Sequence, residues 1–170
     1  HNGNFDLQKD GWYAFHHGVD VQETGGIDGT AALSSRLALN TGNNIAQSID
    51  GSCLEVNNEY DVSFSYKIVD YDGTSSNLPY LRIHSKDYLI SDPSNKHFTT
   101  ISAKDFRTLT SDFDSSGWNT ISGVWTIDAN TANADKHVMY VAGGSHQVVV
   151  DNFSIQPATA TARRLRRHSN

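Results

Sequence analysis

The chain has 170 residues, 37% of them hydrophobic, which suits one domain with a single core rather than two small ones. The lone Cys53 excludes an internal disulfide framework and a cysteine-rich zinc cluster. Residues 1–157 carry 9 basic against 19 acidic side chains, a net of −10, and four arginines near the end bring the total to −6. Such a body repels phosphate backbones, so we expect no nucleic-acid partner. The sequence contains no run of about 18 apolar residues, so it predicts no membrane-spanning helix.

Alternating apolar and polar residues, typical of strands with one wet face, dominate the chain. The clearest case is residues 60–68, where tyrosine, valine, phenylalanine and isoleucine alternate with polar residues. In chain order the predicted strands are 12–16, 19–22, 31–39, 45–49, 60–68, 80–84, 120–127, 137–142 and 148–155.

Turn sequences rich in Gly, Asn, Asp and Ser separate these strands, for example at 24–26, 40–43, 70–73, 114–117 and 143–144. No window of a dozen residues has a helical apolar stripe. We therefore predict an all-β fold, a jelly-roll sandwich of two antiparallel sheets, over residues 1–156. Residues 157–170, with their four arginines, lack alternation and are predicted to be a basic linker or disordered tail.

Catalytic patterns are missing from the sequence. It has no Gly-x-Ser-x-Gly elbow, no phosphate-binding glycine loop and no His-Glu-x-x-His motif. Glycoside hydrolysis needs two positioned carboxylates, and most acids here stand in turn sequences, where they usually cap. We predict that the protein is not an enzyme.

The strand at 80–84 has the composition of a saccharide-binding surface. If Leu81 and Ile83 face the core, then Tyr80, Arg82 and His84 share the outer face, about 6.6–6.8 Å apart. Sugar rings stack on aromatic side chains, and their hydroxyls need hydrogen-bonding partners. An ordinary polar strand face is the alternative interpretation.

A series of short segments resembles carbohydrate-binding modules of families 4, 9, 16 and 22. In order these segments are 2–6 (NGNFD), 11–12 (GW), 29–33 (GTAAL), 45–49 (IAQSI), 60–64 (YDVSF), 118–125 (WNTISGVW), 139–141 (MYV) and 150–155 (VDNFSI). The resemblance covers nearly all of residues 2–155. It implies a jelly roll with the topology of galactose-binding domains, without catalytic activity and usually attached to a glycoside hydrolase.

The resemblance also implies a structural calcium ion. In such modules the acid of the opening motif and the first acid of the closing motif join loop carbonyls around the ion. Here those acids are Asp6 and Asp151, with the carbonyls near Asp28 and Gly29. Calcium takes 6–8 oxygen ligands, which carboxylates and turn carbonyls can supply. The alternative is that both acids cap turns.

Further ligand-binding candidates are Trp12 and Tyr13, which point to opposite sides of their strand, and the amides of Asn44 and Gln47. Two departures stand out. Xylan- and glucan-binding relatives often carry a tryptophan where Asn44 and Ile45 stand, and a glutamate where Ala142 stands.

We therefore predict a non-catalytic module that binds a polysaccharide or oligosaccharide and targets a secreted, extracellular protein to it. An attached glycoside hydrolase is the expected partner, and the start at His1 reads as a mature or trimmed chain. The alternatives are an extracellular structural or adhesion domain, and a small polysaccharide-degrading enzyme.

Overall fold

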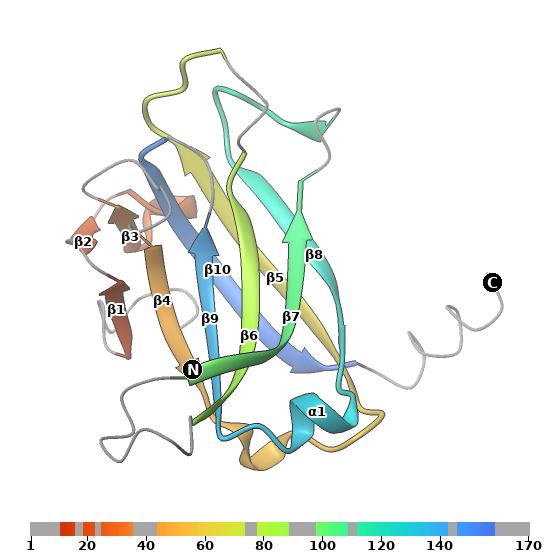
Figure 1. Cartoon of the computed structure of the whole chain (residues 1–170). Helices are drawn as coiled ribbons and strands as arrows, with labels where there is room; N and C mark the ends of the chain where they lie inside the picture. The colour runs from red at the N-terminus through yellow and green to blue at the C-terminus, as the bar shows by residue number, and fades with distance from the viewer. Residues whose placement is uncertain are drawn as a thin grey trace, which may run out of the picture.

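The structure is a computed structural model that describes residues 11–15, 19–22, 25–35, 44–73, 78–88, 98–108, 112–142 and 146–158. In this part of the chain, two five-stranded sheets stack face to face (Figure 1). Each pair of neighbouring strands is antiparallel. The predicted all-β sandwich of the jelly-roll kind is confirmed.

Sheet A lies in front in Figure 1 and has the strand order β1-β4-β9-β6-β7. Its strands are β1 (Trp12–Phe15), β4 (Asn44–Ile49), β9 (Lys136–Ala142), β6 (Tyr80–Tyr88) and β7 (Phe98–Arg107).

Sheet B lies behind it, with the order β2-β3-β10-β5-β8. Its strands are β2 (Val19–Gln22), β3 (Ala32–Ser35), β10 (Val148–Pro157), β5 (Glu59–Ile68) and β8 (Asn119–Thr126).

The helical segments among the described residues are short. They are η1 (Ile27–Gly29), η2 (Gly51–Cys53) and α1 (Ala129–Ala132). The aspartates before two of them cap them: Asp50 accepts a hydrogen bond from Ser52 N, and Asp128 accepts one from Thr131 N. None of the described helices has the length or apolar character to cross a membrane.

The core fills the space between the two sheets because each strand turns its apolar residues inward. On β5 the inward side chains are Tyr60, Val62, Phe64, Tyr66 and Ile68, all buried. On β6 the expectation for Leu81 and Ile83 is confirmed, since each is only 1% exposed. Their neighbours in sequence therefore point away from sheet B.

Strand β7 was not predicted from the sequence. Its pairing with β6 shifts register between Ser85 and Lys86, which leaves Ile101 of β7 as the extra residue of a β-bulge that interrupts the alternation along the strand. Elsewhere the limits differ slightly: β10 includes Pro157, and Ala158 N donates to Glu59 O. Residues 159–170 of the predicted tail lie outside the described residues.

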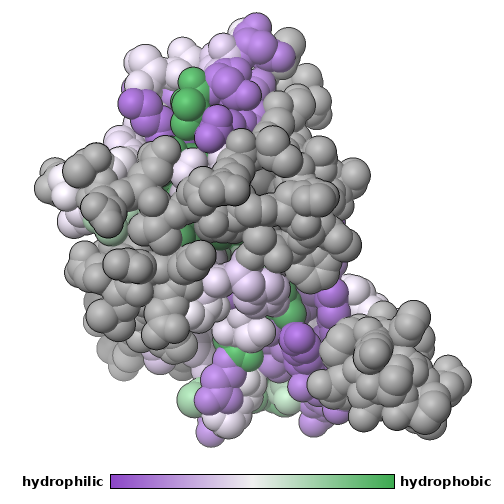
Figure 2. Space-filling model, turned by 90° about the vertical axis from the view of Figure 1, so that its left-hand side faces the viewer, coloured by the Kyte–Doolittle hydropathy of each residue, from purple (hydrophilic) through white to green (hydrophobic). Residues whose placement is uncertain are grey.

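Figure 2 looks onto the edge of the sandwich that carries β1 and β2. Hydrophilic side chains gather at its upper end around a small hydrophobic spot. At the lower end, hydrophobic and hydrophilic side chains come to the surface together.

Candidate functional site

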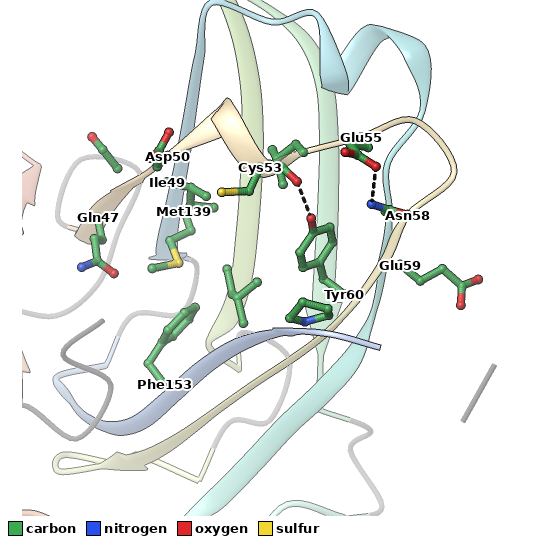
Figure 3. A pocket seen from close by; sticks show the side chains of 14 residues that line it. Gln47, Ile49, Asp50, Cys53, Glu55, Asn58, Glu59, Tyr60, Met139 and Phe153 are labelled. Carbon is green, nitrogen blue, oxygen red and sulfur yellow. Dashed lines mark hydrogen bonds between the residues drawn. The ribbon is translucent and has the colours of Figure 1, made fainter. Parts of the chain in front are cut away.

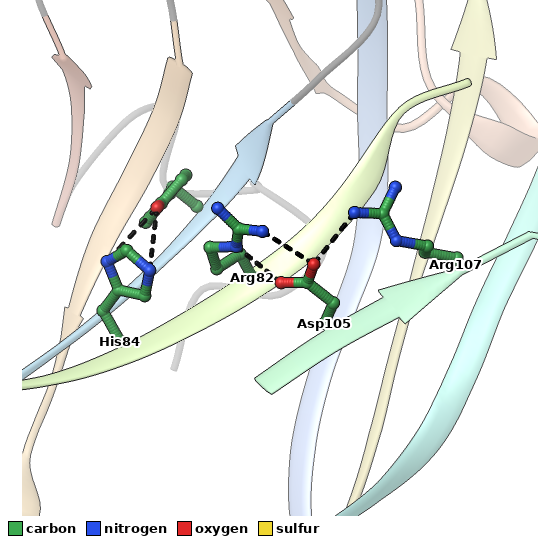
Figure 4. Close-up of polar contacts among 5 residues, drawn as sticks. Arg82, His84, Asp105 and Arg107 are labelled. Carbon is green, nitrogen blue, oxygen red and sulfur yellow. Dashed lines mark hydrogen bonds and ion pairs between the residues drawn. The ribbon is translucent and has the colours of Figure 1, made fainter. Parts of the chain in front are cut away.

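The outer face of sheet A brings together three residues predicted from the sequence and three that were not. We call it the β6 face, and its residues are Tyr80, Arg82, His84, Asp105, Arg107 and Tyr140. Figure 4 shows four of them, Arg82, His84, Asp105 and Arg107, with their polar contacts. Register accounts for the grouping, because directly paired residues of antiparallel strands point to the same side. Arg82 pairs with Tyr140 on β9 and with Asp105 on β7, and Tyr80 pairs with Arg107.

Arg82 and Asp105 form a two-pronged ion pair at the centre of the face. Arg82 Nε donates to Asp105 Oδ1 at 2.5 Å, and Arg82 Nη2 donates to Oδ2 at 2.7 Å. Arg107 Nη2 donates to the same Oδ2 at 2.9 Å. The hydrogen bonds from Arg82 lower the pKa of Asp105, and those to Asp105 raise the pKa of Arg82. Asp105 is therefore a fixed anion between two guanidinium groups.

Both arginines also lie against the ring of Tyr80. The guanidinium carbon of Arg107 is 3.9 Å from the ring centre, and that of Arg82 is 5.0 Å away. Such cation–π contacts orient a guanidinium flat against the ring. Because Arg107 lies so close over the ring, an approaching ligand meets guanidinium N–H groups as well as the aromatic surface.

His84 and Tyr140 form the second polar pair. The Tyr140 hydroxyl lies 3.2 Å from each ring nitrogen of His84, and the ring planes are 83° apart. Burial, followed by the charges of Lys86 and Arg82, lowers the pKa of His84 to about 4. At neutral pH the imidazole is uncharged, so it can donate one hydrogen bond and accept another.

Tyr13 extends the same row of side chains to β1. It pairs with Ala46 on β4, and Ala46 pairs with Tyr140, so one line of paired residues crosses all five strands. Tyr13 is half-buried. Asn44 pairs with Phe15, but its side chain lies outside the described residues.

The structure does not bring Trp12 and Gln47 to the β6 face. They pair with each other on the inner side of sheet A. Trp12 is 6% exposed, and its ring meets Phe153 edge-on with centroids 5.5 Å apart. Of the two neighbouring aromatic candidates, Tyr13 is thus the one that lies on the same outer side of sheet A as the β6 face, because strand alternation turns Trp12 into the core.

Gln47 lines a cavity of about 580 Å³ between β4 and the ends of β5 and β10 (Figure 3). Much of its wall is apolar, with Ile49, Met139 and Phe153 among the lining side chains. Its one lining tyrosine, Tyr60, donates its hydroxyl to Cys53 O at 2.7 Å. The acids that line it are Asp50, Glu55 and Glu59. An apolar cavity with acidic side chains suits a saccharide less well than the β6 face does, because its tyrosine is buried and already bonded.

The predicted calcium position centres on Asp151, which is fully buried. Its Oδ2 accepts hydrogen bonds from Ile27 N at 2.8 Å and Thr30 Oγ1 at 3.1 Å, and its Oδ1 accepts one from Asn152 N at 2.7 Å. Gly26 is held just as closely, since a Cβ there would lie 2.7 Å from Asp151 Oδ2. The carboxylate thus fastens the loop around η1 to β10.

The donors described around Asp151 are all neutral, although a buried carboxylate usually has a cationic partner. Gly29, with φ +78°, is in the same loop. Asp6 and the side chain of Asp28 lie outside the described residues. Within the described ranges, no group of three or more His, Cys, Asp or Glu side chains could hold a metal ion. A cation here would therefore depend on backbone carbonyls and on Asp6 or Asp28.

Sequence reasoning missed Asp105, Arg107 and Tyr140 as parts of the site. The first two lie on the strand whose alternation a bulge interrupts. The signal that could have found them is the segment 105–107, where the apolar Phe106 stands between the charged Asp105 and Arg107. Tyr140 stands in the segment 139–141, but the sequence does not indicate on which side of the sheet it lies. The pairing of Tyr140 with Arg82 settles that side.

The fold is similar to that of solved carbohydrate-binding modules. The CBM22-1 xylan-binding domain from Paenibacillus barcinonensis Xyn10C superposes with a TM-score of 0.65 at 16% identity, over 93% of each chain. The CBM22-1-GH10 modules of Clostridium thermocellum Xyn10B, solved with xylohexaose, give a TM-score of 0.63 at 16% identity, over 92% of this chain and 28% of that one.

A solved CBM4 structure superposes with a TM-score of 0.51 at 18% identity, over 93% of this chain and 99% of that one. No protein-family description matches the sequence, and no curated protein matches it. The likeness therefore lies in the fold, which is the jelly roll of these modules.

Proposed function

We propose that the protein is a non-catalytic module that binds a polysaccharide or oligosaccharide on the β6 face. The observation that carries the proposal is the row formed by Tyr13, Tyr140, Arg82 and Asp105, which lies on one side of a fold similar to that of solved xylan-binding modules. The CBM22 neighbours are described as xylan-binding, and one was solved with a xylo-oligosaccharide.

The chemistry of the face suits a sugar. Tyrosine rings offer surfaces to the C–H faces of pyranose rings, and guanidinium, imidazole and phenol groups offer hydrogen bonds to hydroxyls. Tyr13, Tyr80 and Tyr140 are half-buried, so packing holds their rings while part of each side chain stays accessible. A preformed site of this kind costs little side-chain entropy on binding.

We propose that the ligand specificity of this protein differs from that of the xylan-binding neighbours. Ala142, which stands where relatives often have a glutamate, pairs with Tyr80 and so lies on the β6 side of the sheet. An acceptor carboxylate is thus replaced by a methyl group next to the arginines. Ile45, at one of the positions where relatives often have a tryptophan, is fully buried. Donors rather than acceptors therefore dominate the β6 face.

Catalysis has little support on this face. Hydrolysis of a glycosidic bond takes a carboxylic acid and a second carboxylate about 5–9.5 Å apart. The acid of the face, Asp105, has a lowered pKa and is bonded by two arginines, so it is a poor proton donor. Incubation with a glycan panel should release no reducing ends, and a measurable release would contradict the proposal.

The remaining parts of the proposal concern the setting of the module. It would act outside the cell, as part of a larger protein that carries a glycoside hydrolase, an arrangement supported by the GH10-linked neighbour. A structural calcium ion would be held by Asp151 and Asp6 with carbonyls near Asp28 and Gly29. The support for the ion is the buried Asp151 carboxylate, whose described partners are all uncharged.

Affinity electrophoresis in gels that contain soluble glycans tests the binding function. We expect retardation by at least one glycan, and we expect Tyr80→Ala and Arg82→Ala to abolish or strongly reduce it. Gln47→Ala changes the cavity instead and is the matched control, since it should bind as the wild type does. Loss of retardation only in the Gln47 variant would place the sugar in the cavity. Retardation by no glycan at all would favour the structural or adhesion alternative.

A further inference from the structure

Basic residues are concentrated on the half of sheet A that carries the β6 face. Strands β6, β7 and β9 hold five of the nine basic residues of residues 1–157 but only two of the 19 acidic ones. The five are Arg82, Lys86, Lys104, Arg107 and Lys136. Lys104 pairs with the buried Ile83 and so points to the inner side of the sheet, while the other four share the outer side with the β6 face. The strands of sheet B hold one, Lys67, against four acids. A net positive surface on an acidic protein attracts anions to one side of the molecule.

The same imbalance exists inside the β6 face itself. One carboxylate, Asp105, accepts three hydrogen bonds from two guanidinium groups, which leaves the trio with one positive charge. Arg107 uses one of its five N–H donors in the bond to Asp105, and its side chain is 57% exposed. It therefore has donors and charge available to a ligand.

Geometry favours a carboxylate as the group that meets this charge. Guanidinium groups bind carboxylates through two parallel hydrogen bonds, and Arg82 and Asp105 show that geometry within this protein. A sugar hydroxyl would gain less from a charged donor than an anion does. Moreover, Arg107 covers the Tyr80 ring at 3.9 Å, so a neutral sugar cannot stack on that side of the ring unless the arginine moves.

We propose that the glycan recognised by the β6 face is acidic, and that a uronic acid carboxylate of the chain binds Arg107 beside Tyr80. This inference rests on the proposed function and names the class of saccharide. The sugar ring adjacent to the uronate would then lie toward Tyr140 and His84, which can supply neutral hydrogen bonds.

Matched pairs of polymers test the inference. Polygalacturonate, alginate and glucuronoxylan are each used in two forms, with free carboxylates and after chemical reduction of the carboxyl groups. Dissociation constants are measured by affinity electrophoresis or calorimetry at low and high salt. We expect at least one free-carboxylate form to bind at least about tenfold more tightly than its reduced form, with the difference shrinking as salt rises.

Two charge-neutralising variants locate the contact. Arg107→Gln should lose about tenfold in affinity for the acidic polymer and little for the reduced one. Lys67→Gln removes an exposed cation from the opposite face of the molecule and should leave both affinities unchanged. Since Arg107 is exposed, the variant should keep its fold, which the melting temperature verifies.

The outcomes separate the two proposals. If the reduced and free forms bind equally, or if Arg107→Gln binds the acidic polymer as the wild type does, the acidic-glycan inference fails while saccharide binding stands. If dextran sulfate binds and no uronate polymer does, the assignment to carboxylates is overturned. If no polymer of either form binds, nor any neutral glycan, both proposals fail.

Discussion

Arg82 on β6 and Asp105 on β7 join neighbouring strands through two parallel hydrogen bonds of 2.5 and 2.7 Å. Their side chains are 30% and 26% exposed, so solvent screens the pair only in part. Among the described strands, β7 stands at the end of sheet A and bonds to β6 alone within the sheet. The pair therefore both shapes the candidate site and helps to fasten an edge strand.

A double-mutant cycle measures this ion pair. Arg82→Ala, Asp105→Ala and the double variant should give a coupling energy of about 1 kcal/mol in urea unfolding, at the upper end for partly exposed pairs because the geometry is two-pronged. The cycle for Arg107 with Asp105 should give a smaller value, since Arg107 is 57% exposed. If the double variant loses as much stability as the two single variants lose when added together, the residues are not coupled, and this account of the face is contradicted.

One buried and one half-buried imidazole, those of His137 and His84, predict acid sensitivity. Burial lowers the pKa of His137, and burial with the nearby positive charges lowers that of His84 to about 4. In the unfolded chain both groups titrate near 6.5. As the pH falls below about 6.5 the unfolded chain takes up protons that the folded protein does not, so the free energy of unfolding decreases. Above that pH the contribution is complete.

Urea unfolding between about pH 7.5 and 5 measures the effect, because carboxylates near their usual pKa contribute little in that window. The wild-type midpoint should fall steadily below about pH 6.5. His84→Gln keeps a hydrogen-bonding group next to Tyr140 but cannot take up the proton, so its midpoint should fall less steeply. A wild-type midpoint that is constant or rises on acidification would disprove the assignment.

Alternation predicted the fold and part of the site. Residues 80–84 showed from the sequence which side chains share a face, because Leu81 and Ile83 had to be buried. Alternation also predicted that Trp12 and Tyr13 point to opposite sides of their strand, but not which of the two faces the core. That choice depends on the pairing of Tyr13 with Ala46 and of Ala46 with Tyr140, a register set by distant segments.

Contacts between side chains on different strands could not be predicted from the sequence, because they too depend on the strand register. Asp105 meets Arg82 across a strand pair whose bulge at Ile101 changes which residues face outward. Gln47 was expected at the sugar site, together with Asn44, as an amide that could hydrogen-bond to sugar hydroxyls. Three residues along a strand reverse the side, and Gln47 accordingly pairs with Trp12 on the inner surface.

Close packing between the sheets predicts a cost at Gly123. A Cβ there would lie 2.5 Å from Cδ1 and 2.8 Å from Cε1 of the buried Phe106 ring on the opposite sheet. Gly123→Ala should therefore lower the free energy of unfolding by about 1–3 kcal/mol, as overpacking does. Ser122→Ala, exposed on the same strand, is the control and should change stability by less than about 0.5 kcal/mol. Similar stability of the two variants would contradict the packing between β7 and β8.

Calcium should raise the melting temperature through Asp151. A ligand at 100 times its dissociation constant stabilises a folded protein by about 2.7 kcal/mol, which corresponds to roughly 5–10 °C for a domain of this size. Thermal unfolding with calcium and with a chelator measures the shift. Asp151→Asn should abolish the shift, and in chelator it should still lose about 1–3 kcal/mol, because three hydrogen bonds converge on the carboxylate. Glu55→Gln, an exposed acid far along the chain, should keep the full calcium effect. If neither calcium nor the chelator changes the melting temperature of the wild type, the calcium prediction is wrong. Asp151 would then only join the η1 loop to β10 through its hydrogen bonds.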